Sequence, residues 1–137
     1  FFPDGKRLSM NLGHFRGGNM DLTQVNCDGS DLKPMTRACL GSGHPTVYPD
    51  GRHVLTDTYT NERWTHEGTT PLRWIDLQDE SDRQIARIRT QPAQMPDGSL
   101  RIDPHPAWDR SWRWVAFNAF HEGTRRVFVA DMSSLLA

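Results

Sequence analysis

The segments His66–Leu77, HEGTTPLRWIDL, and His121–Met132, HEGTRRVFVADM, decide the fold. Each places His-Glu-Gly-Thr before a short apolar run that contains an Asp near its end. A glycine that follows polar residues is typical of a hairpin turn, and short runs of alternating apolar residues are typical of β-strands. This match predicts that the chain repeats one structural unit. The alternative is a single β-sandwich whose hairpins are merely similar.

The repeat extends outward from these two segments and includes a third copy at the start of the chain. Pro-Asp-Gly turns at 3–5 and 49–51 each precede a strand, and the turn 109–111 takes their place in the last copy. Two further sets of residues then match. The first set is Leu8, Val54 and Val115. The second set is Asn11, Asp57 and Asn118, and these polar residues are predicted to hold the strand ends. The expected strands are Arg7–Leu12, Met20–Asn26, Pro34–Leu40, His53–Tyr59, Leu72–Leu77, Arg83–Thr90, Trp112–Phe120 and Arg125–Met132.

Four short strands in roughly 40–50 residues are typical of a β-propeller blade. The sequence therefore predicts an all-β chain of about three four-stranded antiparallel blades, with repeats at about 1–40, 44–90 and 105–137. A propeller needs at least about four blades to close its ring. The chain is then part of a longer protein, assembles with further copies to complete a ring, or stacks as an open arc. A first residue other than Met favours the first of these.

Composition limits the classes of partner. With 137 residues, 36% of them hydrophobic, and a net charge of −1, the chain is typical of a soluble globular domain and not of a nucleic-acid binder. No run approaches the eighteen or so apolar residues of a membrane helix, so no membrane partner is expected. Cys27 and Cys39 lie out of register across their turn, which predicts two free thiols and leaves the cellular compartment open.

Two motifs carry a resemblance to a known family. The order strand, Pro-Asp-Gly, strand resembles the TolB-type β-propeller repeat. GHPTVYPDG at 43–51 and RIDPHPAWD at 101–109 are together similar to the final blades of the oligogalacturonate lyase family and its uncharacterised relatives. The resemblance implies a seven-bladed propeller with a divalent metal, manganese, in its central funnel. It also implies a histidine base that cleaves acidic pectin fragments by β-elimination.

The resemblance also implies metal ligands. In the family one ligand comes from a His-Pro, which His44 matches here, and the others come from a Gln-x-x-His-Pro-His-Pro cluster. His105 matches the last histidine of that cluster, Asp103 replaces the other histidine, and Leu100 stands where the glutamine would be. The implied metal site is therefore His44, Asp103 and His105, with one ligand changed and one lost.

Position within a blade gives an independent reason to pair the two histidines. The first strand of each blade lines the central channel, so residues just before it lie at the channel mouth. His44 and His105 are thus expected to be neighbours on adjacent blades. Neutral imidazoles and a carboxylate suit manganese, zinc or iron. The alternative is that each imidazole only bonds the backbone of a neighbouring blade.

The loops after each second strand are expected around the same opening. They supply the catalytic candidates His14, Arg63, His66 and His121, and the substrate-binding candidates Arg16 and Trp64. A histidine titrates near neutral pH and suits a general base, an arginine binds a carboxylate through two parallel bonds, and an indole stacks on a sugar ring. The alternatives are that His66 and His121 cap their turns and that Trp64 anchors its loop.

Two functions of different class remain open at this point. The first is a carbohydrate-active enzyme that cleaves acidic oligosaccharides by metal-dependent β-elimination. The second is a non-catalytic TolB-like propeller that binds a glycan or a protein partner across the same funnel. The loss of the glutamine and of one histidine favours the second function. Convergence of His44, Asp103, His105, His14 and Arg63 favours the first. A remnant without activity is also compatible with the sequence.

Overall fold

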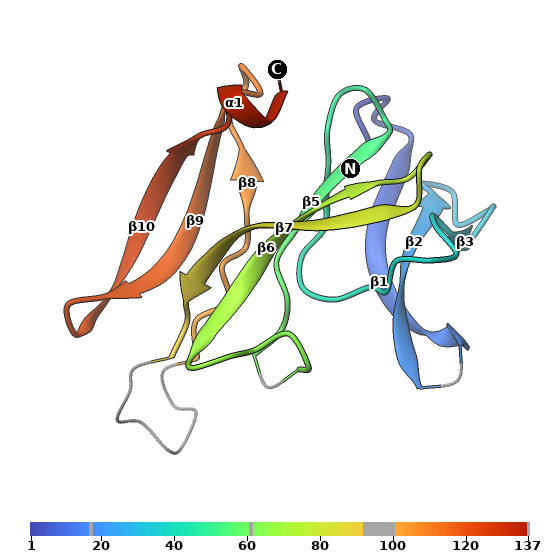
Figure 1. The fold of residues 1–137 in the computed structure, drawn as a ribbon. Coiled ribbons are helices and arrows are strands. Elements are labelled where there is room, and N and C mark those ends of the chain that lie inside the picture. Colours follow the sequence, from blue (N-terminus) through green and yellow to red (C-terminus); the bar gives the residue numbers. More distant parts are fainter. Residues whose placement is uncertain (17, 61, 92–100, 137) are drawn as a thin grey trace.

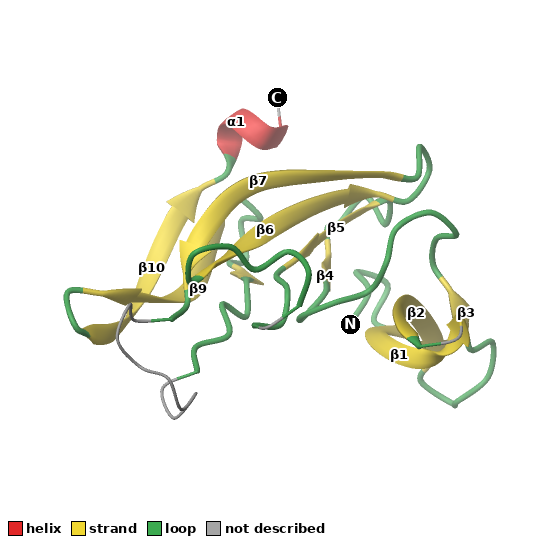
Figure 2. Cartoon of the chain, turned by 60° about the horizontal axis from the view of Figure 1, so that its bottom comes forward, coloured by secondary structure: helices red, strands yellow, loops and turns green. Residues whose placement is uncertain are grey.

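Three antiparallel sheets follow one another along the chain and end in a short helix (Figure 1). The structure is a computed structural model, and it describes residues 1–16, 18–60, 62–91 and 101–136. Figure 2 shows the first sheet and the third on opposite sides of the middle sheet. The order of the sheets is thus the order of the predicted repeats.

The first sheet has the strand order β1-β2-β3. Its strands are β1 (Arg7–Arg16), β2 (Asn19–Asn26) and β3 (Lys33–Pro34). The expected strand Pro34–Leu40 is wrong, because only its first residue pairs regularly with β2 and Leu40 returns as an isolated bridge. Between them the Thr36 hydroxyl accepts the backbone N–H groups of Ala38 and Cys39. Such local bonds compete with the ladder of a sheet and turn the chain away from it.

The middle sheet has four strands and the third sheet has three within the described residues. The middle strands are β4 (Thr46–Val47), β5 (His53–Thr56), β6 (Thr69–Asp76) and β7 (Ser81–Arg89). The third sheet contains β8 (Ala107–Trp108), β9 (Trp114–His121) and β10 (Thr124–Asp131), and α1 (Ser133–Leu136) follows it. The predicted succession of antiparallel blades is therefore confirmed, with all four strands in the middle sheet and three in each of the other two among the described residues.

The repeated His-Glu-Gly forms the same hairpin turn in both sheets. Glu67 and Gly68 have φ of 47° and 71°, and Glu122 and Gly123 have φ of 46° and 78°. Two successive residues with positive φ are what a type I′ turn requires, and its twist matches the twist of the two strands that it joins. The shared motif is therefore a turn signal. In the third sheet it joins β9 directly to β10, and in the middle sheet it closes the isolated bridge between His66 and Thr69 at the start of β6.

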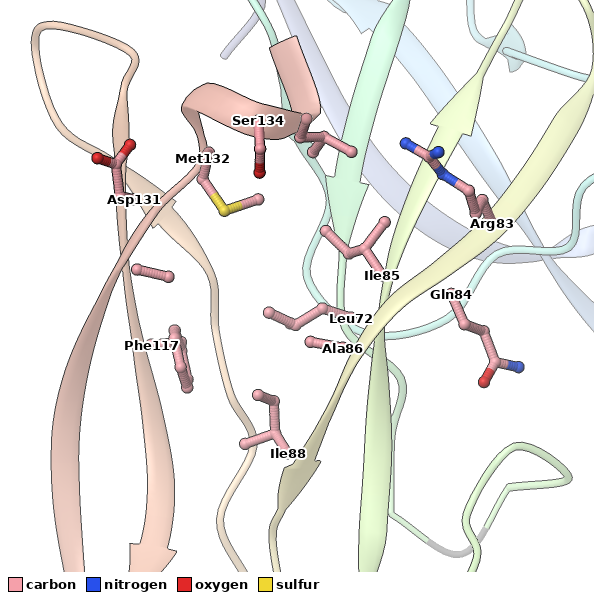
Figure 3. A pocket seen from close by; sticks show the side chains of 12 residues that line it. Leu72, Arg83, Gln84, Ile85, Ala86, Ile88, Phe117, Asp131, Met132 and Ser134 are labelled. Carbon is pink, nitrogen blue, oxygen red and sulfur yellow. The ribbon is translucent and has the colours of Figure 1, made fainter. Parts of the chain in front are cut away.

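The middle sheet buries both of its faces. Paired Val54 and Ile75 pack toward the first sheet, whereas paired Leu55 and Trp74 pack toward the third. Figure 3 shows Leu72 and Ile88 opposite Phe117 and Met132 across the gap between the middle and third sheets. The two buried clusters are Phe2, Leu22, Cys39, Val47, Val54 and Ile75, and Leu55, Leu72, Trp74, Ile88, Val115, Ala119 and Met132. Burial on two sides explains why β6 reads as a nearly continuous buried run.

The outer face of the third sheet is open. Val127 and Val129 occupy the repeat positions of Leu72 and Trp74, yet they are 70% and 63% exposed. In the middle sheet these positions are covered by the next sheet. The expectation that further copies of the chain cover this face and complete a ring stays a prediction.

The predicted free thiols are confirmed, with Cys27 exposed and Cys39 buried. Burial raises the pKa of the Cys39 thiol. Within the described part of the chain, no helix has the length and apolar character that spanning a membrane requires.

The turn between β8 and β9 supplies a test of the fold in acid. Hydrogen bonds from the Ser111 hydroxyl and from the backbone of Trp114, Ser111 and Arg113 lower the pKa of Asp109 to about 2. Because the folded pKa lies below the usual value of about 3.9, the carboxylate stabilises the fold above pH 4 and loses this effect between about pH 4 and pH 2.

We expect Asp109→Asn to lower the urea midpoint of unfolding at pH 7 and to matter progressively less as the pH falls through that window. The measurement is urea unfolding at several pH values between 7 and 3. Glu67→Gln, which changes another exposed carboxylate in a turn, is the control. A midpoint difference for Asp109→Asn that does not depend on pH would contradict the assignment.

Candidate metal centre

His44, Asp103 and His105 lie together where the middle and third sheets adjoin. One ligand atom from each of them lies within 4.8 Å of the others. The two imidazole rings stack with their centroids 3.4 Å apart and their planes 22° from parallel. The expectation that these histidines are neighbours on adjacent blades is thereby confirmed, whereas their role as metal ligands stays a prediction.

The backbone places each of the three residues. His44 precedes β4, and Asp103 and His105 precede β8. Asn118 in β9 donates its backbone N–H to the Pro104 carbonyl at 2.8 Å and its side-chain amide to the Asp103 carbonyl at 3.4 Å. These bonds hold the segment leading into β8 against the third sheet.

A buried carboxylate, Asp57, joins the two histidines. Its side chain is 0% exposed and follows β5 directly. One oxygen accepts the backbone N–H of His44 at 2.5 Å, and the other accepts the backbone N–H of His105 at 3.0 Å. The Nδ1 atom of His44 also lies 3.1 Å from Asp57 Oδ2. One side chain therefore fixes two segments that belong to different sheets.

Two residues next to the Asp57 carboxylate, Gly43 and His105, have positive φ angles. Gly43 has φ of 68°, and a Cβ atom there would overlap Asp57 Oδ1. Only glycine fits, because it has no side chain and tolerates positive φ. His105 itself has φ of 47°, which is uncommon for a residue other than glycine. The bond from its N–H to Asp57 holds it in that conformation.

The bond between His44 and Asp57 selects the ring nitrogen that faces a metal. With Nδ1–H donated to a carboxylate, Nε2 keeps its lone pair for coordination, as in many carboxylate–histidine–metal sites. Bonds of about 2.0–2.2 Å put ligand atoms at most about 4.4 Å apart. The observed spread of up to 4.8 Å lies within about 0.4 Å of that value. The three residues therefore fit a divalent ion with nitrogen and oxygen ligands.

Tyr59 and Arg101 border the site. The Arg101 Nε–H donates to Asp103 Oδ1 at 2.9 Å, which raises the pKa of Arg101. Its guanidinium lies 5.4 Å from the centroid of the Tyr59 ring, and that ring meets His44 edge-on. Burial, together with the charges of Asp57 and Asp103, raises the pKa of Tyr59. The phenol therefore stays neutral and available as a donor beside the histidines.

Arg63 and Trp64 lie together on the loop between β5 and β6. They line a cavity of about 320 Å³ that also includes residues of the first sheet. The Arg63 and Arg73 guanidinium groups lie 4.4 and 4.5 Å from the centroid of the Trp64 ring. The next residue back, Glu62, accepts the hydroxyl of Ser42, two residues before His44. The loop is thus tied to the segment that carries the candidate ligand, and the roles of Arg63 and Trp64 stay predictions.

His66 and His121 are not brought into the cluster. Both are exposed, and the β9–β10 turn that carries His121 forms the outer tip of the third sheet (Figure 1). His66 exchanges backbone bonds with Thr69, and His121 contacts Glu122 and Phe128. These contacts agree with the alternative that the histidines belong to their turns, and a catalytic role for either stays a prediction.

The remaining candidates fall outside the described side chains. His14 and Arg16 belong to β1 by their backbone, but their side chains lie outside the described part of the chain. Leu100, which replaces the family's glutamine, also lies outside the described residues.

Asp57 is the residue of the candidate site that sequence reasoning missed, because it was assigned only to holding a strand end. Asn11 and Asn118, the residues that match Asp57 in the other two repeats, could have indicated its role. Asn11 donates its side-chain amide to the Gly43 carbonyl at 2.5 Å, and Asn118 donates to the Asp103 carbonyl. The shared position therefore binds the segment that leads into a first strand, and at Asp57 it binds two such segments.

Comparison with solved structures decides the fold class. TolB from Acinetobacter baumannii matches with a TM-score of 0.65 at 13% identity, over 96% of this chain and 28% of that chain. An oligogalacturonate lyase in complex with manganese matches with a TM-score of 0.66 at 16% identity, and one from Vibrio parahaemolyticus with 0.67 at 18%. Each of these two matches covers 96% of this chain and 34% of the other. The chain has the fold of β-propeller blades.

The propeller blades of this chain span about a third of the length of the propellers they match. No protein-family model matches the sequence, and a search of curated proteins finds no significant relative. The predicted fold class is thereby confirmed from structure, with two propeller types, TolB and oligogalacturonate lyase, as neighbours.

Replacing Asp57 tests whether this carboxylate organises the site. The two backbone N–H groups bond different oxygens of Asp57, and an asparagine replaces one of these oxygens with an NH2 group that cannot accept. We therefore expect Asp57→Asn to lower the free energy of unfolding by about 2 kcal/mol. Metal affinity should fall by about tenfold or more, because the bond that orients His44 is lost. Urea unfolding and calorimetric titration with Mn²⁺ measure the two effects.

The matched control is Asp50→Asn, which breaks a carboxylate–histidine pair with His53 at the other end of β5. It should leave metal affinity unchanged. Equal metal affinity in the parent and in Asp57→Asn would contradict the role given to Asp57.

Proposed function

We propose that these blades carry a divalent metal site and that the protein acts on acidic oligosaccharides by β-elimination. The observation that carries the proposal is the convergence of His44, Asp103 and His105 around the buried Asp57. The fold shared with an oligogalacturonate lyase in complex with manganese supports manganese as the ion. The position of the three residues, their nitrogen and oxygen ligand atoms and the propeller fold thus all favour metal-dependent β-elimination.

The chemistry requires removal of the proton next to a uronate carboxylate. A divalent ion, when bound, neutralises that carboxylate and makes the neighbouring proton more acidic. His44 Nε2, one Asp103 oxygen and a ring nitrogen of His105 would hold it. Asp57 keeps the His44 ring in the required orientation, and the neutral Tyr59 offers a hydroxyl donor close by.

The sugar would extend from the metal centre toward the loop between β5 and β6. The Arg63 guanidinium is exposed and suits a second carboxylate. The Arg63 and Arg73 guanidinium groups both lie over the Trp64 ring, and of the two arginines Arg73 is buried whereas Arg63 is exposed. Stacking of a sugar on Trp64 therefore requires Arg63 to swing off the ring and onto the substrate.

The general base in this proposal is a histidine of a neighbouring loop. His14, followed two residues later by Arg16, is the first candidate, because both belong to the strand β1 beside the middle sheet. His66 and His121 are the other candidates, and either needs a movement of its turn to reach the substrate.

A non-catalytic propeller that binds a glycan or a protein partner is the second candidate function. It is favoured by one observation: among the described side chains, no histidine outside the trio contacts the metal centre. The fold shared with TolB is compatible with this function.

Titration with metal ions tests whether His44 and His105 bind a metal. We expect protein purified without a histidine tag to bind Mn²⁺ with micromolar affinity, and His44→Ala and His105→Ala each to weaken binding by about tenfold or more. Elemental analysis and calorimetric titration provide the measurement. His121→Ala removes an exposed histidine away from the site and is the control. Absence of binding by Mn²⁺, Zn²⁺ and Fe²⁺ would rule out the metal centre.

Activity is tested by the ultraviolet absorbance of the unsaturated uronate that β-elimination forms. We expect the signal with one class among pectic, ulvan and alginate fragments, and its loss after treatment with a chelator and in His105→Ala. A protein that binds one of these fragments without forming the product would favour the binding module. The metal titration described above then decides whether the ion serves binding alone.

A further inference from the structure

A second cavity adjoins the metal centre on the side of the third sheet. It has a volume of about 290 Å³ and is lined by Arg101, Ile102, Asp103, His105, Asn118 and Arg125. Two of these residues belong to the candidate metal centre, and two others carry guanidinium groups. The volume lies near the lower limit for small-molecule sites, which suits one sugar residue better than a longer chain.

Arg125 comes from β10 and shares a sheet face with Asn118 of β9. The register pairs Arg125 with Phe120 and Val127 with Asn118, and residues two apart on a strand point to the same side. Arg125 is exposed, and it has no ion pair or hydrogen bond with the part of the chain that the structure describes. Its guanidinium is therefore free to bind a ligand.

The repeat does not require an arginine at this position. In the matched segments Arg125 corresponds to Thr70, which is fully buried in the middle sheet. A blade therefore packs with a small residue there. The arginine of the third sheet is a local departure, and it lies beside the cavity that touches the metal centre.

Arg101 is held in place on the opposite wall. Its Nε–H binds Asp103, its guanidinium lies near the Tyr59 ring, and its side chain is still 47% exposed. No hydrogen bond to its terminal amino groups is present among the described residues, so they remain available. Two guanidinium groups therefore line the cavity together with the carboxylate of Asp103, and the buried Asp57 is a further carboxylate that acts on Arg101.

The geometry points to a carboxylate-binding subsite: Arg101 and Arg125 take the carboxylate of an acidic sugar residue next to the residue held at the metal centre. Planar guanidinium groups bind carboxylates through paired bonds, and such charge-assisted bonds are strong. Asn118 also lines the cavity, and because its amide nitrogen donates to the Asp103 carbonyl, we expect its side-chain oxygen to accept a sugar hydroxyl. The choice of a uronate rests on the proposed function, whereas the presence of two arginines in the cavity does not.

The experiment measures binding of D-galacturonate by calorimetry at low salt, in the presence and absence of Mn²⁺. We expect Arg125→Ala to weaken binding by about tenfold or more, and Arg125→Lys to lose part of the affinity because it keeps the charge without the fork. Binding should weaken as salt is raised. Neutral D-galactose should bind weakly, and equally weakly to the parent and to Arg125→Ala.

Arg126→Ala is the matched control, because Arg126 is the next residue, exposed, on the other face of the same strand. It should bind D-galacturonate as the parent does, and circular dichroism should show both alanine variants folded. Unchanged affinity in Arg125→Ala would overturn the subsite. Sulfate that competes as well as D-galacturonate would overturn its assignment to a sugar acid.

The experiments distinguish failure of the subsite proposal from failure of the proposed function. An effect of Arg125→Ala that persists in chelator-treated protein supports the subsite even if no lyase activity is found. Conversely, metal-dependent activity that is equal in the parent and in Arg125→Ala supports the proposed function and overturns the subsite.

Discussion

The buried carboxylate of Asp57 is the interaction on which the candidate site depends. A carboxylate without exposure to water is costly unless hydrogen bonds compensate for the loss of hydration. Here the compensating donors are the backbone N–H groups of His44 and His105 and the ring of His44. Because those donors belong to different sheets, satisfying one charge also brings two imidazoles into contact. The geometry of the candidate metal centre is thus a consequence of how a buried charge is paired.

The fold also depends on contacts between sheets, because each sheet buries its apolar residues against the next one. The middle sheet is buried on both sides, with Val54 and Ile75 facing one neighbour and Leu55 and Trp74 facing the other. A single blade cannot bury its own faces, so each depends on the next. The candidate site lies at such a junction and exists only where two blades adjoin. The face around Val127 is the corresponding surface of the third sheet, and it is exposed.

Charge links the metal centre to the adjoining cavity. Asp103 is both a candidate ligand and the partner of Arg101, so one carboxylate belongs to both sites. A divalent ion would draw on the same carboxylate and leave Arg101 and Arg125 with less negative charge nearby. Metal binding and binding of an anion in the cavity should therefore support each other, since each places opposite charge beside the other.

The sequence by itself determined the features whose causes are local. The paired Glu-Gly turns, the alternating strands and the neighbourhood of His44 and His105 follow from a repeat that can be read in the printed residues. Only the tertiary structure decided the role of Asp57, the early end of β3 and the pocket beside Arg125. The physical reason is that these depend on contacts between residues far apart in the chain. A strand pattern specifies which face is apolar, but not which buried charge meets which backbone across two sheets.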